Sequence, residues 1–383
     1  MKIYKYVLIF IFSLFSLCYA LDKNLQIEYI KGSVEDKTLA VKKAGENGDV
    51  TLALTSIDFA LENYELTGED KELINLLRTS VEVLTKNKGL NESQISSKLG
   101  KIFTTYKDSS LRIATLEALS EYPSSNSVSI LNAFVSEKIQ KNEPMDEVLE
   151  NAIKCLSYVG NKTSFNLLFL ADILEIWQGS SELLESAFGP LASSSENEIL
   201  NILSKVTVDL KLKVLEIVTK NKQISENVKG EVAQNALSDA IYSIGNSAEY
   251  SEQDVKLQLA ALEVVAKTKW TRASNLATEY FSIAANEYAH DVITTEEFTK
   301  VIQNVASVAT SDTGRKLSSY LEELNKRMEA GNPPEDAVVL AVINALGGLG
   351  DKAAFDYLLY VTYLDYPQTI TTAARNALAK LKW

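Results

Sequence analysis

Very few residues in this chain have the types and spacing that catalysis requires. His290 is the sole histidine among 383 residues, and it lies near the predicted end of a helix, where we interpret it as a surface residue rather than a general base. Acidic pairs occur at Glu296-Glu297 and Glu322-Glu323. Adjacent residues of a helix do not face each other, so neither pair forms an acid–base couple by itself. An enzyme would need carboxylates that only the fold brings together, and we expect no catalytic residue.

Residues for metal and cofactor chemistry are also scarce. The two cysteines and the single histidine cannot form the clustered ligand set of a zinc site. The glycine-rich segment 347–350 lies between two predicted helices, whereas a phosphate-binding loop needs a preceding strand and a final Lys-Ser or Lys-Thr pair. We therefore expect a tight turn at residues 347–350, and we expect neither a metal nor a cofactor.

The first twenty residues have the layout of a secretory signal peptide. Two lysines form a basic start, and an apolar run follows at residues 6–17. This run is shorter than the roughly 20 residues of a membrane-spanning helix. We expect cleavage after Ala20, because Cys18 and Ala20 supply the small residues that signal peptidase requires before the cut. Two alternatives are lipidation at Cys18, which follows Leu17 instead of the usual small residue, and an uncleaved anchor.

Composition and charge are those of a folded, acidic chain. Hydrophobic residues make up 46% and charged residues 23%, as in ordinary globular proteins. The formal net charge is -13, and removal of residues 1–20, which hold two lysines and no acid, leaves about -15. Such a charge disfavours nucleic acids and anionic membranes as partners. Cys155 is the one cysteine after residue 20, so we expect no intrachain disulfide. We expect the thiol of Cys155 to be buried in the core. We also expect no membrane span in the mature chain.

A short apolar cassette recurs along the chain. Its clearest copies occupy residues 111–120, 210–219 and 257–266, and looser copies end at Cys155-Leu156, Ala345-Leu346 and Ala377-Leu378. Units of helix size that recur at spacings of a few tens of residues are typical of stacked repeat proteins. The cassette therefore predicts a repeat architecture, in which its Leu and Ala positions fill the space between neighbouring units.

The cassettes and the segments between them have the periodicity of amphipathic helices. In the first copy the predicted buried stripe consists of Leu111, Ala114, Thr115, Ala118 and Leu119. Arg112 and Glu117 point away from this stripe. Asp, Ser and Thr residues that precede the helices supply capping oxygens, and short turns between helices favour antiparallel hairpins. Apolar strands that alternate with helices are not found, so an α/β fold is disfavoured.

The pattern resembles the HEAT-repeat family, with armadillo-type arrays as near relatives. Residues 341–353 are similar to the first helix and turn of such a repeat, and residues 355–359 to the start of its second helix. Residues 372–378 resemble the start of one more repeat, and 108–135 and 148–174 are further units. The resemblance implies an all-α superhelix, or solenoid, of antiparallel helix hairpins. We expect a signal peptide at 1–20, an N-terminal helical region of degenerate repeats or a cap at 21–105, and HEAT-like repeats at 106–383. A non-repeating helical domain is the alternative.

Stacked hairpins present a long surface without a deep pocket, which suits the binding of another protein or a peptide. We therefore expect an exported, non-catalytic interaction scaffold of the bacterial periplasm or cell envelope. The alternative is a periplasmic binding or carrier protein that encloses a hydrophobic or glycan ligand. Candidate partner-binding residues lie at positions that the repeat leaves free: Arg112, Lys154, Lys211, Trp270 and Arg375. Trp270 has a second interpretation, as a hydrophobic staple across its turn.

Overall fold

The computed structural model describes residues 23–87, 92–242 and 251–382, and these residues form helices joined by short turns. Within them there is no strand, and the one β-bridge pairs Asp351 with Lys382. The predicted signal peptide, with Cys18 and its cleavage point after Ala20, lies outside the described residues. None of the described helices combines the length and apolarity that crossing a membrane would take. The predicted all-α, solenoid-like fold class is confirmed.

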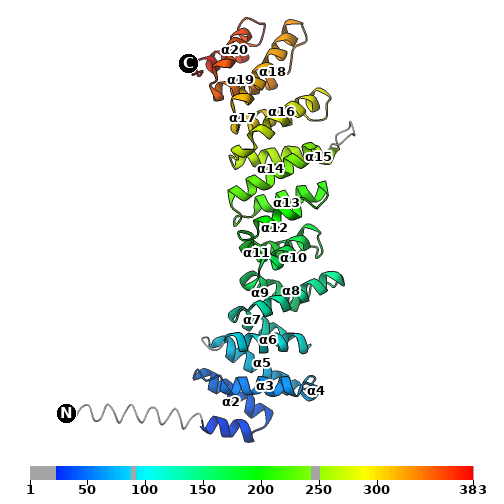
Figure 1. Ribbon diagram of the computed structural model, residues 1–383, viewed down its shortest axis with the longest axis vertical. Coiled ribbons are helices and arrows are strands. Elements are labelled where there is room, and N and C mark those ends of the chain that lie inside the picture. Colours follow the sequence, from blue (N-terminus) through cyan, green and yellow to red (C-terminus); the bar gives the residue numbers. More distant parts are fainter. Residues whose placement is uncertain (1–22, 88–91, 243–250, 383) are drawn as a thin grey trace, which may run out of the picture. The chain divides into compact units, whose positions relative to one another are not determined.

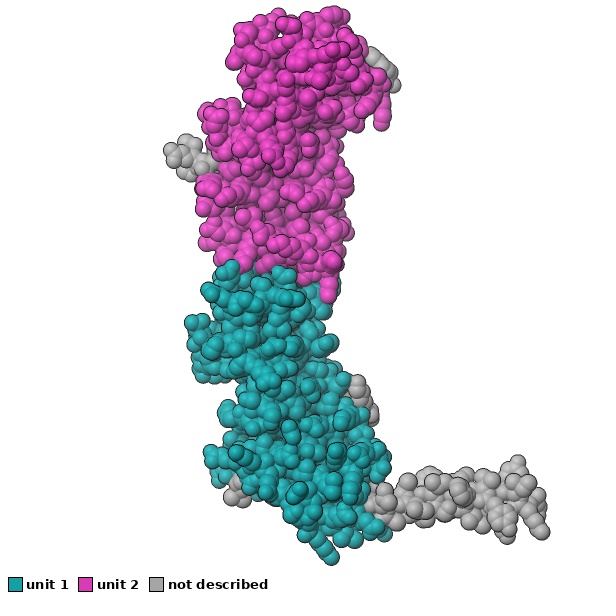
Figure 2. Space-filling view, turned by 180° about the vertical axis from the view of Figure 1, so that it is seen from behind, with its two compact units in different colours: residues 1–194 teal, residues 195–383 magenta. Residues whose placement is uncertain are grey.

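The chain divides into two compact units, Met1–Ser194 and Ser195–Trp383, which are coloured separately in Figure 2. The division falls inside the region that we expected to be one run of repeats, and not at residue 105. The described part of residues 21–105 packs within the first unit, in the same layers as the helices that follow it. It is therefore a continuation of the helical stack in that unit.

The first unit contains two layers of helices (Figure 1). Its helices are residues 23–31, α2 (Val34–Glu46), α3 (Thr51–Glu62), α4 (Tyr64–Thr67), α5 (Lys71–Lys86), α6 (Glu92–Thr105), α7 (Ser109–Glu121), α8 (Ser125–Gln140), α9 (Glu147–Val159), α10 (Lys162–Ile173) and α11 (Ser181–Ala192). Successive neighbours α2, α5, α7, α9 and α11 form one layer. The other layer consists of α3, α6, α8 and α10, each packed on the next.

The second unit repeats this arrangement. Its helices are α12 (Glu196–Leu203), α13 (Val208–Lys220), α14 (Glu226–Tyr242), α15 (Glu252–Lys267), the 3-10 turn η1 (Thr271–Ala273), α16 (Ser274–Ala289), α17 (Thr295–Ser307), α18 (Ser311–Glu329), α19 (Asp336–Leu349), the 3-10 turn η2 (Lys352–Ala354), α20 (Phe355–Val361) and α21 (Gln368–Leu378). The odd-numbered helices α13 to α21 form one layer and the even-numbered helices α12 to α20 form the other. Each helix thus touches its hairpin partner and the next helix of its own layer.

Polar capping residues explain why several of the helices begin where they do. Asp108 accepts a hydrogen bond from the Leu111 amide at 2.9 Å, and Ser124 and Asp146 cap α8 and α9 in the same way. Thr294 forms a reciprocal capping box with Glu297 at the start of α17. Each cap satisfies backbone N–H groups that a helix leaves unpaired in its first turn. The expectation that Asp, Ser and Thr residues cap the helices is confirmed at these four positions.

Every copy of the cassette falls on the layer of α2, α5, α7, α9 and α11 in the first unit or on the odd-numbered layer of the second unit. The three clear copies lie in α7, α13 and α15, and the looser copies lie in α9, α19 and α21. All five residues of the predicted stripe in α7 are buried, which confirms that prediction. Cys155 of α9 is also buried, with 3% of its surface exposed, and burial raises the pKa of its thiol to about 11. The cassette is therefore the packing motif of one helix layer in each unit.

The glycine-rich segment corrects one prediction. We expected a turn throughout residues 347–350, but Gly347 and Gly348 belong to α19 and Gly350 alone has the left-handed backbone that ends the helix, with φ 69°. A Cβ atom at position 347 would lie 2.8 Å from the Cβ atom of Ala377 in α21. The glycine at this position thus permits the close approach of α19 and α21, a tertiary contact that local propensity does not reveal.

Candidate functional site

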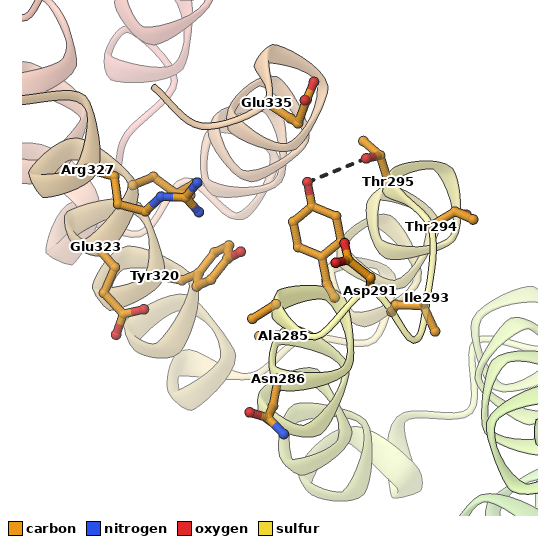
Figure 3. A pocket seen from close by; sticks show the side chains of 13 residues that line it. Ala285, Asn286, Asp291, Ile293, Thr294, Thr295, Tyr320, Glu323, Arg327 and Glu335 are labelled. Carbon is orange, nitrogen blue, oxygen red and sulfur yellow. Dashed lines mark hydrogen bonds between the residues drawn. The ribbon is translucent and has the colours of Figure 1, made fainter. Parts of the chain in front are cut away.

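A hollow of about 830 Å³ opens on the second unit, where the α16–α17 turn lies beside α18 and the α18–α19 turn (Figure 3). Its lining combines aromatic, hydroxyl and charged side chains: Ala285, Asn286, Tyr288, Ala289, Asp291, Ile293, Thr294, Thr295, Tyr320, Glu323, Leu324, Arg327 and Glu335. Most of the charged members are exposed, so the hollow is open to solvent. All of its walls belong to one unit.

Two turns set the shape of this hollow. α16 ends at His290, an exposed C-cap residue whose ring nitrogen Nδ1 lies 2.8 Å from the Asn286 carbonyl, which confirms its predicted place at a helix end. Asp291 then takes a left-handed conformation with φ 59°, and the chain turns into the Thr294 cap of α17. On the other side, the left-handed Gly331 ends α18 and leads towards the first turn of α19.

An aromatic cluster forms the inner wall. Tyr288 stacks on Phe298 with ring centroids 4.8 Å apart, and Tyr320 meets the same Phe298 edge-on at 5.6 Å. Phe281 completes the cluster by stacking on Phe298. The Tyr288 hydroxyl lies 3.4 Å from the Thr295 hydroxyl (Figure 3). Rings held on several sides in this way keep their phenol groups at fixed positions on the wall.

Arg327 supplies the positive charge of the hollow, and it forms no ion pair within 4 Å among the described residues. Glu323 lies four residues earlier on α18, a spacing that permits pairing, but its carboxylate points away from the guanidinium in Figure 3. The neighbouring Glu322 and Lys326 do pair at that spacing, at 2.7 Å. The positive charge of Arg327 also lowers the pKa of the Tyr320 phenol, although burial of that ring raises it overall. The guanidinium is therefore available to a binding partner.

A buried acid lies behind this wall. Glu287 of α16 has none of its surface exposed, and neither carboxyl oxygen has a hydrogen-bond partner of normal geometry among the described residues. Burial raises the pKa of Glu287 to about 7, and the Tyr280 hydroxyl on the same helix only partly offsets that shift. The carboxyl group is not part of the lining, so it acts on the stability of the unit rather than on a ligand.

The lining is suited to binding more than to bond making. It offers phenols, hydroxyls, one guanidinium and three exposed carboxylates. In the described part of the chain, no three His, Cys, Asp or Glu side chains are grouped as metal ligands. Side chains of these types hold a peptide or a protein side chain through hydrogen bonds and ring contacts.

The basic residues predicted from the sequence lie in separate places. Lys154 of α9 is exposed and pairs with Glu150 at 2.6 Å on the same helix. Lys211 of α13 is mostly buried and pairs with Asp239 of α14 at 2.6 Å, so it joins two helices. Arg375 of α21 is exposed and makes no ion pair with the described residues. The structure therefore does not bring these candidates together into one surface site.

The other two candidates have specific packing contacts. Trp270 is half-buried against α14, where a Cβ atom on Gly230 would lie 2.7 Å from its ring. Its Nε1 donates to Gln234 at 2.7 Å, and the Arg272 guanidinium lies 4.9 Å from the ring centre. Trp270 thus packs on α14, and neither the staple across its own turn nor a role in partner binding is tested by these contacts. Arg112 lies between two aromatic rings of unit 1.

The hollow itself was not predicted from the sequence. Tyr320 and Arg327 lie seven residues apart on α18, and Tyr288 comes from α16. A spacing of seven places two residues on one helix face, which marks Tyr320 and Arg327 as neighbours. No sequence signal shows that this face meets the end of α16.

Fold and site define an all-α protein with two layers of antiparallel helices in each unit and an open, polar hollow on the second. A scan against protein-family models finds no match, and a search of curated proteins finds no significantly similar sequence. The resemblance to HEAT repeats therefore stays a prediction.

Proposed function

We propose that this protein is a non-catalytic interaction scaffold, exported to the periplasm or cell envelope, and that the hollow on the second unit is a contact point for a protein partner. The observation that carries the proposal is Arg327, an exposed arginine without an ion pair beside two partly exposed tyrosines. Arginine and tyrosine are enriched where protein interfaces hold most of their binding energy. The export part rests on the basic and apolar pattern of residues 1–20.

The openness of the site favours a partner's surface over an enclosed ligand. Glu323, Arg327 and Glu335 are all exposed at its rim. A hydrophobic or glycan carrier instead needs a cavity that buries most of its ligand. The exposed rim and the rigid aromatic wall suit a protruding side chain or turn of another protein.

The test uses the purified protein as bait for envelope extracts. The charge reversal Arg327→Glu should abolish capture of the partner. The new carboxylate would repel the group of the partner that the guanidinium attracts. Lys326→Glu is the matched control, since it makes the same charge change at the next position of α18 but outside the lining. We expect this control to capture the partner as the wild type does.

A photo-crosslinking residue at the exposed position of Asn286 locates the contact in the same experiment. Crosslinks to the captured protein are expected from this position. The proposal is wrong if the wild type captures no protein, or if Arg327→Glu and Lys326→Glu capture the same protein equally well.

A further inference from the structure

A second charged site lies in the first unit, around Arg112. Its guanidinium carbon lies 4.4 Å from the ring centre of Phe103 and 4.6 Å from that of Phe134. Phe103 comes from α6 and Phe134 from α8, and the two rings meet edge to face at 5.2 Å. Contacts with two rings hold the guanidinium in one place and orientation.

One polar group of Arg112 is buried without a partner among the described residues. The residue is half-buried, and its Nε atom is buried with no acceptor among the described residues. Within residues 23–87, 92–242 and 251–382, no carboxylate lies within 4 Å of its guanidinium. A buried donor without an acceptor destabilises the folded state, so such a group calls for an explanation in a folded protein. Burial accordingly lowers the pKa of Arg112, against the opposite influence of Asp146 and Glu137.

The nearest acids are already engaged with other cations. Lys138 pairs with Glu143 at 2.6 Å and with Asp146 at 3.1 Å. Glu137 pairs with Lys141 at 2.5 Å. The charge of Arg112 is therefore not neutralised by a direct contact with any of these groups.

A hollow of about 390 Å³ surrounds this guanidinium. Its lining includes the two rings, the apolar Ile130 and Ala133, and the exposed Lys107, which forms no ion pair within 4 Å among the described residues. Two basic groups without an ion pair among the described residues thus converge on one small hollow whose lining is part apolar and part charged. An anionic group that enters it gains the hydrogen bonds that Arg112 lacks.

We propose that the Arg112 hollow binds a single carboxylate, namely the acidic side chain of a partner protein. A guanidinium fork matches the two oxygens of a carboxylate. The carboxylates of Glu137 and Glu143 also line the hollow and would repel a doubly charged phosphate more than a carboxylate. The identity of the occupant as a protein side chain rests on the proposed scaffold function, whereas carboxylate binding at Arg112 is measurable without a partner.

The test follows the Nε–H resonance of Arg112 by nuclear magnetic resonance in the full purified protein. The probes are sodium acetate, the acetylated and amidated peptide Ala-Leu-Glu-Leu-Ala, its Gln counterpart, and inorganic phosphate. We expect acetate and the Glu peptide to shift this resonance, and the Gln peptide to bind at least about tenfold more weakly, as loss of a charged hydrogen bond implies.

Two variants and one control accompany the titration. Lys107→Gln should weaken binding of the Glu peptide about threefold through loss of a surface charge, with the ring contacts unchanged. Arg112→Gln should abolish it, and circular dichroism checks that this variant folds. Arg78→Gln changes a partly exposed arginine of α5 that pairs with Glu82 and lies outside the hollow, and it should bind as the wild type does.

Three results overturn the inference: no shift with either carboxylate probe, equal affinity for the Glu and Gln peptides, or tighter binding of phosphate than of the Glu peptide. None of these three results contradicts the proposed contact at Arg327, because that contact is measured by capture of a partner. Loss of capture at Arg327 likewise leaves carboxylate binding at Arg112 unaffected.

Discussion

Glu287 is fully buried and Arg112 is half-buried, and neither has an ionic partner among the described residues, but their chemistry gives them opposite consequences. An arginine stays charged in proteins, because its pKa is above about 12. Arg112 therefore has to be stabilised by aromatic rings and by an anion from outside. A glutamate can instead take up a proton, and Glu287 does so at a pH near neutrality. Arg112 is thus suited to the recognition of an anion, and Glu287 makes the free energy of unfolding depend on pH.

Glu287 should destabilise the fold as the pH rises. Its pKa is about 7 in the folded chain against an ordinary value of 4.5, so the folded state keeps its proton longer than the unfolded state. The free energy of unfolding should therefore fall between pH 4.5 and pH 7, by up to about 3 kcal/mol. The neutral variant Glu287→Gln should lose this decline and be more stable than the wild type at pH 8. Urea denaturation at pH 5 and pH 8 measures both effects.

The exposed Glu323 provides the control for this prediction. Glu323→Gln removes one carboxylate from the same unit, but from a position in contact with water. Its stability should follow that of the wild type within about 0.5 kcal/mol at both pH values, as surface changes usually do. A Glu287→Gln variant with the same pH dependence as the wild type would show that the carboxyl group is solvated.

Single residues show where sequence reasoning succeeds and where it ends. Spacing within α7 correctly assigned Leu111 and Leu119 to the buried stripe and put Arg112 outside it. The same spacing could not show that Phe103 and Phe134 enclose Arg112, because they belong to two other helices. Burial of Glu287 likewise depends on what packs against α16, and a helical pattern is equally compatible with an exposed acid at that position.

At the scale of elements, local signals predicted the helix ends well, with one exception. Caps such as Asp108 and Thr294 act on amides within three residues, so a single sequence contains the whole interaction. The glycines of α19 are different, because their role depends on α21. Gly347 is helical in spite of its low propensity, and the lost propensity is offset by the close contact with Ala377.

This contact predicts opposite effects for two adjacent glycines. Gly347→Ala places a methyl group 2.8 Å from the Ala377 Cβ atom and should destabilise the protein by about 1–3 kcal/mol through overpacking. Gly348→Ala meets no atom within 4 Å and should stabilise it by about 0.5–1 kcal/mol, because alanine is the better helix former. Thermal unfolding compares the two variants. Equal destabilisation by both would contradict the packing role of Gly347.

At the scale of the whole molecule, contacts are made chiefly between neighbours. α7 packs on α5, α6 and α9, and α19 packs on α17, α18 and α21. In stacked helical arrays the stability is approximately a sum over units and the interfaces between neighbours. Within each unit the cassettes all lie in one helix layer, which fits this picture because the same interface recurs from helix to helix of that layer.

Because each helix contacts chiefly its neighbours, we expect a destabilising substitution to affect only the helices next to it. Leu119→Ala in α7 and Leu346→Ala in α19 each truncate a fully buried side chain and should cost about 2–5 kcal/mol. Hydrogen exchange should accelerate in α5, α6 and α9 for Leu119→Ala, and in α17, α18 and α21 for Leu346→Ala. Each variant is the control for the other, since the cavity has the same chemistry in a different unit. Equal acceleration in both regions by either variant would mean that the chain unfolds as one cooperative body, and that neighbour contacts do not govern its stability.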